Sequence, residues 1–166
     1  MKTKDAAHRA PESRFASPAW GWAAIGARII VGGIMIYSGL HKASAPVEEF
    51  MVVIDGYQIL PQPHVRLFAH LVPWTELLAG AFLLAGLWTR LAAAATACLS
   101  ASFFVALAST LVRGIPLPNC GCFGQAVHLQ VWQAMTLDAI LIGCAAVAWR
   151  RGRERLALDR WAEEVP

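Results

Sequence analysis

Residues 22–40, WAAIGARIIVGGIMIYSGL, form the stretch of sequence that decides the fold. As a single helix, this run is long enough to cross the roughly 30 Å hydrocarbon core of a bilayer. Its glycines, among them Gly32, Gly33 and Gly39, suit the close helix packing that is common in lipid. We interpret it as an uncleaved transmembrane helix, because the run is longer than the apolar core of a typical signal peptide.

The composition of the whole chain is that of a membrane protein. Of its 166 residues, 57% are hydrophobic and 15% are charged, whereas an ordinary soluble domain is about 25% charged. The formal net charge of +3 comes largely from the two ends of the chain, so it indicates orientation in the bilayer. We therefore expect the lipid bilayer, and no nucleic acid, as a partner.

Three further apolar runs predict three more membrane spans. Together with the first run they indicate an all-α integral membrane protein, a bundle of four transmembrane helices. The predicted order is a flexible cytoplasmic tail over residues 1–20, a membrane domain over 21–149 with spans at about 22–40, 67–88, 91–112 and 131–149, and a basic cytoplasmic tail over 150–166.

A short amphipathic helix is predicted in the first external loop, residues 43–65. Val47, Phe50, Met51 and Ile54 recur there at helical spacing, and acidic residues lie off that face. We expect this helix to lie at the membrane interface. In the second span, Pro73 is expected to kink the helix or to mark its beginning.

The distribution of Lys and Arg predicts the topology. Basic residues flank membrane spans on the cytoplasmic side, and here they gather in the N-terminal tail, at Arg90 and over residues 150–155. Both termini are therefore expected in the cytoplasm. The loop between the third and fourth spans is then expected outside, in the periplasm if this is the inner membrane of a Gram-negative bacterium.

That external loop contains the polar segment PNCGCFG, residues 118–124. In an extended chain, Cys120 and Cys122 point to the same side, with Cα atoms about 6 to 7 Å apart. A disulfide between them could close only with strain, and an exposed, strained disulfide is easily reduced. We interpret the pair as redox-active and take these two cysteines as the candidate catalytic residues. An inert or permanently bridged pair and a metal site remain alternatives.

Ionisable residues within the spans are the next candidates, because a charge in a bilayer is costly. Glu76 and Asp138 each lie roughly 10 to 15 Å below the outer face, and Lys42 ends the first span. Lys42 could pair with either carboxylate, which would lock the bundle as a structural ion pair. The three residues could also handle protons during thiol chemistry, since reducing a disulfide consumes protons.

Four histidines fall near the predicted outer face and could join the cysteines in a metal site. Their spacing fits no Cys/His ligand pattern, so each is better explained as an interfacial polar residue, and no metal site is predicted. No organic cofactor can be assigned from a motif. The tryptophans at the span ends are best explained as an aromatic belt, although some of them could contact a quinone. The histidines are His41, His64, His70 and His128.

The sequence resembles the DoxX-like membrane proteins in residues 38–42, SGLHK, and residues 73–77, PWTEL. The motif CGCFG, residues 120–124, resembles the MauE branch, the methylamine utilisation proteins. The resemblance covers about residues 22–149. It implies a polytopic inner-membrane protein that supports maturation of the disulfide-rich small subunit of methylamine dehydrogenase, together with a periplasmic thioredoxin-like partner or a disulfide-rich client.

The predicted function is thus a membrane thiol–disulfide redox protein, a possible thiol–disulfide oxidoreductase. One alternative is a non-enzymatic membrane scaffold that docks a partner through its external loops. A second alternative, implied by the DoxX-like resemblance, is a membrane subunit of a quinone-linked sulfur oxidoreductase.

Overall fold

The fold is described here for residues 18–117, 120–121 and 129–151 of a computed structural model. All regular structure in these residues is helical, and four of the helices are long and apolar enough to cross a membrane. The predicted all-α bundle with four spans and one short extra helix is confirmed, and the chain is a multi-pass membrane protein. The helices are α1 (Pro18–Ser44), α2 (Val47–Gly56), α3 (Gln62–Ala85), α4 (Thr89–Arg113) and α5 (Val131–Arg151).

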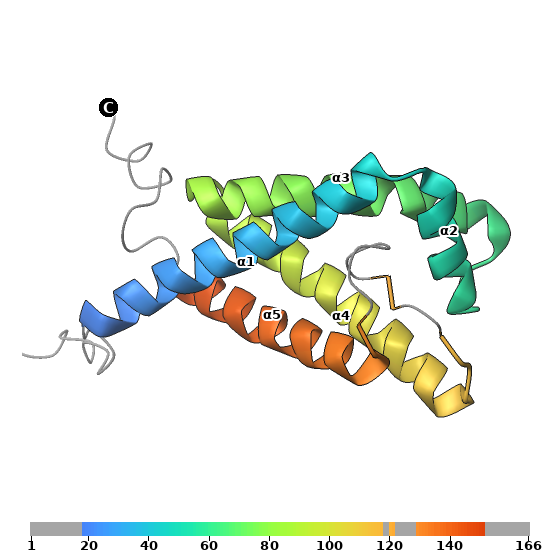
Figure 1. Ribbon diagram of the computed structural model, residues 1–166. Coiled ribbons are helices and arrows are strands. Elements are labelled where there is room, and N and C mark those ends of the chain that lie inside the picture. Colours follow the sequence, from blue (N-terminus) through green and yellow to red (C-terminus); the bar gives the residue numbers. More distant parts are fainter. Residues whose placement is uncertain (1–17, 118–119, 122–128, 152–166) are drawn as a thin grey trace, which may run out of the picture.

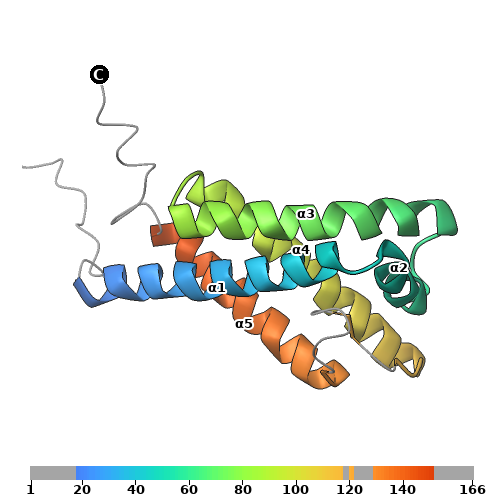
Figure 2. The ribbon, with the colours of Figure 1, turned by 45° about the horizontal axis from the view of Figure 1, so that its top comes forward.

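The four long helices run back and forth along the bundle (Figure 1). Helices α1 and α3 lie side by side, and α4 packs against α5 (Figure 2). Helices α3 and α4 leave their shared turn in different directions and diverge (Figures 1 and 2). The start of α1 and the end of α5 lie at one end of the bundle, whereas α2 and Cys120 lie at the other. The tails predicted over residues 1–20 and 150–166 fall almost wholly outside the described residues.

Glycines bring the backbones of α1 and α3 into contact. A Cβ atom built at Gly39 would lie 2.8 Å from the Pro73 carbonyl oxygen and 3.0 Å from the Glu76 Cβ. A Cβ atom at Gly80 would lie 2.8 Å from the Gly32 carbonyl oxygen. No side chain fits at these positions without a shift of neighbouring atoms, so glycines on both α1 and α3 set how closely the two helices approach.

Replacing Gly39 by alanine should loosen this helix pair, because the added methyl group meets backbone atoms of α3. We expect Gly39→Ala to lower the free energy of unfolding by about 1–3 kcal/mol, measured by unfolding of the purified protein in detergent micelles. The matched control is Gly33→Ala on the same helix, where an added Cβ meets nothing within 4 Å. Equal stability of the two variants would contradict the close approach.

The turn between α3 and α4 is short and stabilised by backbone and side-chain donors. Gly86, at the end of α3, has a positive φ of 69°, and the Leu87 amide donates to the Phe82 carbonyl at 3.0 Å. Arg28, buried on α1, donates its Nε–H to the Leu83 carbonyl at 3.0 Å. A cation at a helix C-terminus is favourable, so Arg28 ties α1 to the end of α3.

Helix α2 packs on the bundle through its apolar face. Phe50 and Ile54 are buried against Val65 and Ala69 of α3. The helix was predicted at the membrane interface, and the structure adds that α3 covers its apolar face, because the chain reverses within the few residues that join α2 to α3. As a result, α2 closes one end of the bundle.

At Pro73 of α3 the structure excludes one of the two predicted alternatives. The helix begins at Gln62, after Pro61, and continues through Pro73 to Ala85. Pro73 therefore does not mark the beginning of the helix. It lies where α1 approaches most closely, and this packing holds the segment helical although proline cannot donate a backbone hydrogen bond.

Candidate functional site

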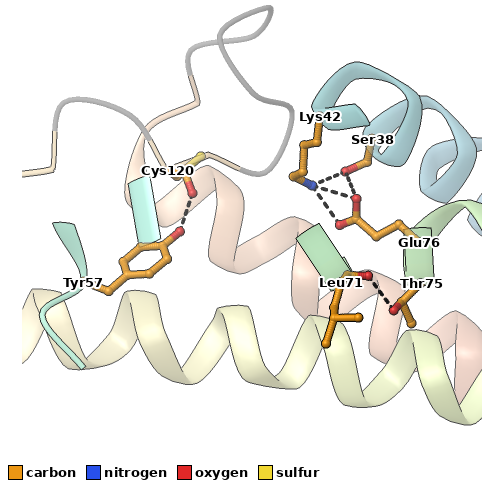
Figure 3. Close-up of polar contacts among 7 residues, drawn as sticks. All are labelled: Ser38, Lys42, Tyr57, Leu71, Thr75, Glu76 and Cys120. Carbon is orange, nitrogen blue, oxygen red and sulfur yellow. Dashed lines mark hydrogen bonds and ion pairs between the residues drawn. The ribbon is translucent and has the colours of Figure 1, made fainter. Parts of the chain in front are cut away.

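A buried ion pair lies between α1 and α3 (Figure 3). The Lys42 ammonium lies 2.8 Å from Oε1 and 2.9 Å from Oε2 of Glu76, and it donates to the Ser38 hydroxyl at 2.6 Å. Ser38 in turn donates to Glu76 Oε2 at 3.1 Å. The Lys42 and Glu76 side chains are only 1% and 4% exposed, so the pair is removed from solvent and lipid.

Helical spacing and aromatic rings hold this cluster in place. Ser38 and Lys42 are four residues apart on α1 and therefore share one face. The Lys42 ammonium also lies 5.4 Å from the centroid of the Phe50 ring and 5.5 Å from that of Phe103. Such cation–π contacts add to the ion pair in a desolvated site. Helices α1, α2, α3 and α4 thus meet at one ammonium group.

Asp138 on α5 supplies the second buried carboxylate. It is 5% exposed, and its Oδ2 atom has no hydrogen-bond partner among the described residues. Asp138, Ser38 and Glu76 line one cavity of about 20 Å³, which is room for about one water molecule. The sequence allowed Lys42 to pair with either carboxylate; the structure pairs it with Glu76 and places Asp138 within electrostatic range of both.

Cys120 packs against the face of α5 that also carries Asp138. It is 1% exposed and packs with Tyr57, Leu107 and Ala134, the last of which precedes Asp138 by one helical turn. Cys120 and Asp138 are also within electrostatic range of each other. The structure therefore brings together Cys120, Asp138 and the Lys42 cluster, which the sequence places in three separate segments.

The Tyr57 side chain holds Cys120 through the backbone. Its hydroxyl donates to the Cys120 carbonyl at 2.6 Å (Figure 3). Tyr57 ends α2, and the Arg113 guanidinium donates to the backbone carbonyls of Tyr57 and, at 3.2 Å, Gln58. The next residue, Gly121, has a φ of +70°, and a Cβ there would clash with Val53 of α2. Residues 120–121 are thus fitted closely against α2.

The predicted exposure of the cysteine pair is wrong for Cys120. The sequence predicted an exposed cysteine pair in an external loop, but residues of α2 and of the start of α5 cover the Cys120 thiol. Cys122, the other candidate, lies outside the described residues. The Cys120 sulfur can therefore react with a reagent or a protein only after the side chains that cover it have moved.

Several residues of the site were not among the predicted ones. Tyr57 lies within the predicted first external loop, Arg113 follows the predicted third span, and Ser38 lies near the end of the predicted first span. The sequence could have identified Ser38, because a residue four positions before Lys42 on a helix shares its face. The sequence could also have pointed to Tyr57, because a tyrosine next to an amphipathic helix that becomes buried needs a hydrogen-bond partner for its hydroxyl.

The other reactive side chains do not join this site. His41, His64 and His70 belong to no group of three or more metal-ligating residues within the described part of the chain, and His128 lies outside it. Cys98 is exposed on α4, and Cys144 is half-buried against the core of the bundle.

Comparison with known proteins identifies the family of this chain. The family described as methylamine utilisation protein MauE matches residues 20–151, which include the whole buried cluster. This chain belongs to the MauE family. No solved structure is significantly similar to it.

Two curated relatives carry the same name. The methylamine utilization protein MauE of Paracoccus denitrificans is 29% identical over 125 residues, which cover 75% of this chain and 67% of the relative. The MauE protein of Methylophilus methylotrophus is 33% identical over 106 residues, which cover 60% of this chain and 56% of the relative. The match thus spans little more than half of the second relative.

Removing one charge of the buried ion pair should destabilise this MauE-family protein strongly. In Lys42→Met the Glu76 carboxylate stays buried without its ammonium partner, which costs about 3–5 kcal/mol of folding free energy. The loss can be measured by unfolding in detergent micelles. The control is the double variant Lys42→Met, Glu76→Gln, which removes both charges and should recover most of the loss. A double variant no more stable than the single one would contradict a direct charge pair.

Removing the Tyr57 hydroxyl should make the Cys120 thiol easier to reach. We expect Tyr57→Phe to raise the alkylation rate of Cys120 about fivefold, since one hydrogen bond contributes about 1 kcal/mol against local opening. The rate is measured by mass shift in a background where Cys98, Cys122 and Cys144 are serine. Tyr37→Phe is the matched control, because Tyr37 is 48% exposed. An unchanged rate in Tyr57→Phe would mean that this bond does not hold the loop.

Proposed function

We propose that this chain is a membrane thiol–disulfide redox protein in which Cys120 and Cys122 exchange disulfides with a partner protein. The observation that carries the proposal is the position of Cys120. Its thiol is buried beside Asp138, at the end of the bundle where the Lys42–Glu76 pair also lies. A purely structural cysteine would need neither a second buried carboxylate nor a nearby ammonium.

The buried groups have a chemical use in this reaction. A thiol reacts as its thiolate, so it must lose a proton before disulfide exchange and regain one afterwards. Asp138, with an oxygen that accepts no hydrogen bond from the described residues, can take that proton. The Lys42 ammonium lies within electrostatic range of Asp138 and stabilises negative charge there.

Burial suggests different roles for the two cysteines. A partner disulfide cannot reach the Cys120 sulfur directly, because the side chain is 1% exposed. We assign Cys120 the role of the inner thiol. In this reaction a partner's thiolate attacks the Cys120–Cys122 disulfide at Cys122 and releases the Cys120 thiolate. The second thiol of the partner then displaces Cys122, which leaves the partner oxidised and the pair reduced.

The family suggests the biological setting. Both curated relatives are named methylamine utilization proteins. The resemblance of the CGCFG motif to the MauE branch implies a role in maturation of the methylamine dehydrogenase small subunit. We therefore propose a disulfide-rich periplasmic client or a thioredoxin-like carrier as the partner, with the loop of Cys120 in the periplasm of the inner membrane. The wider likeness to DoxX-like proteins, with the alternative of a subunit of a sulfur oxidoreductase, stays a prediction.

Serine substitutions test the proposal in cells. In a Paracoccus denitrificans strain that lacks its own MauE, we expect this chain to restore growth on methylamine. Cys120→Ser and Cys122→Ser should abolish that growth while the protein stays at normal abundance in the membrane.

The control is the variant Cys98→Ser, Cys144→Ser, which removes the two cysteines outside the site and should restore growth. Full growth with both Cys120 and Cys122 replaced would exclude the redox role. It would favour a scaffold, which should still retain a co-purifying partner in the double-serine variant.

A further inference from the structure

A large apolar pocket opens between the diverging helices α3 and α4. Its volume is about 500 Å³, whereas an apolar cavity of about 150 Å³ already holds a benzene molecule. Phe68 of α3 and Val105 of α4 line the pocket and are 43% and 64% exposed. Both residues belong to helices that are long and apolar enough to cross the membrane, so the pocket opens toward lipid. A hydrocarbon chain can therefore enter it from the bilayer.

The lining of this pocket offers no hydrogen-bond donor to a ligand. Its two hydroxyl groups belong to Tyr57, which donates to the Cys120 carbonyl, and to Ser102, which donates to the Cys98 carbonyl at 2.7 Å. The other lining side chains are hydrocarbon. A polar ligand would leave its own hydrogen-bonding groups unsatisfied here, which is costly. The lining therefore fits a hydrocarbon chain.

The length of the pocket distinguishes an acyl chain from a helix of another protein. Along α4 the lining residues run from Leu99 to Ala106, a distance of about 11 Å at a rise of 1.5 Å per residue. A transmembrane helix is about 10–12 Å wide and crosses about 30 Å of hydrocarbon, so it would contact a longer stretch of its neighbour. The short pocket favours a narrow chain.

Arg113 places a positive charge at one end of the pocket. It is the last residue of α4 and follows the lining residue Ala106 by seven positions, or about two helical turns, so the two residues share a face. The Arg113 guanidinium donates to the backbone carbonyls of Tyr57 and Gln58. Tyr57 and Ile59, on either side of Gln58, both line the pocket. The charge therefore lies where a membrane span ends and the pocket begins.

The Arg113 guanidinium can still bind an anion. The residue is exposed, and three of its five N–H groups donate to the carbonyls of Ser109, Tyr57 and Gln58. No carboxylate of the described residues forms an ion pair with it. A guanidinium with N–H groups to spare is well suited to a phosphate, whose oxygens accept short, charge-assisted hydrogen bonds.

We propose that the pocket holds one acyl chain of an anionic phospholipid, that Arg113 binds the phosphate of this lipid, and that the bound lipid keeps the Cys120 thiol covered. Lipid tails are as apolar as the lining, so the chain gains little by leaving the bilayer, and the phosphate contact provides the selectivity. Tyr57 connects the lipid to the thiol, because it lines the pocket and its hydroxyl holds the Cys120 carbonyl. The proposal is independent of the redox reaction.

Native mass spectrometry of the full-length protein released from detergent micelles tests the lipid site. The probe is dioleoyl phosphatidylglycerol, and the control is dioleoylglycerol, which has the same chains and no phosphate. We expect one phosphatidylglycerol to bind saturably and at least about tenfold more tightly than dioleoylglycerol, because a hydrogen bond to a charged group contributes that much. Arg113→Gln should remove the difference. Equal binding of the two lipids, or binding that does not saturate, would overturn the site.

Two pocket-filling variants test where the acyl chain lies. Ala101→Phe and Val105→Phe place a ring in the pocket and should weaken phosphatidylglycerol binding about tenfold, because the ring takes the volume that the chain needs. The matched control is Ile140→Phe on α5, which is 55% exposed in the native protein and does not line the pocket. Its binding should be unchanged. Two variants keep the test valid if one fails to fold, and full binding by both would refute this position of the chain.

The alkylation rate of Cys120 tests the effect of the lipid on the thiol. In a background where Cys98, Cys122 and Cys144 are serine, a lipid that binds only the covered state lowers opening by the factor 1 + [L]/Kd. Phosphatidylglycerol at about nine times its Kd should therefore slow alkylation about tenfold, and dioleoylglycerol at the same concentration should not. An unchanged or faster rate would contradict the coupling. Growth of the strain with both Cys120 and Cys122 replaced would refute the redox proposal and leave these lipid measurements unaffected.

Discussion

The burial of Lys42 against Glu76 is the constraint on which the rest of the structure depends. Two charges at the core of a membrane bundle are tolerated only with close partners, and here each is met within hydrogen-bonding distance. The pair requires α1 and α3 to touch, which in turn requires glycine at the contact. It also fixes Ser38, Phe50 and Phe103 around one ammonium group, so four helices share a common centre.

The same constraint explains where the candidate chemistry lies. Helices α1 and α3 pack against each other, whereas α3 and α4 diverge from their shared turn (Figures 1 and 2). Helix α2 and Cys120 lie at the end of the bundle away from that turn. An apolar pocket lined by residues of α3 and α4 shares Leu99 and Phe103 with the small cavity of the buried carboxylates. A buried thiol, two buried carboxylates and an apolar pocket thus lie close together in the bundle.

Much of this arrangement could be predicted from the sequence, and the rest depends on tertiary packing. Apolar runs of membrane length predicted the spans, and rare charges within them singled out Lys42, Glu76 and Asp138. Periodicity also predicted α2, but it could not tell a face that meets lipid from a face that meets protein, since both are apolar. Burial of Cys120 and its contact with Tyr57 join residues 63 positions apart, and no local pattern encodes such a contact.

The most direct test of the account is the redox state of Cys120 and Cys122 in intact cells. In a variant without Cys98 and Cys144, a membrane-impermeant maleimide that adds mass reports the pair before and after treatment with a reductant. The account predicts that labelling from the periplasmic side changes with respiratory state and is completed by reductant, with Cys120 reacting more slowly than Cys122 because its thiol is buried. Constant labelling of both thiols under every condition would contradict a cycling disulfide.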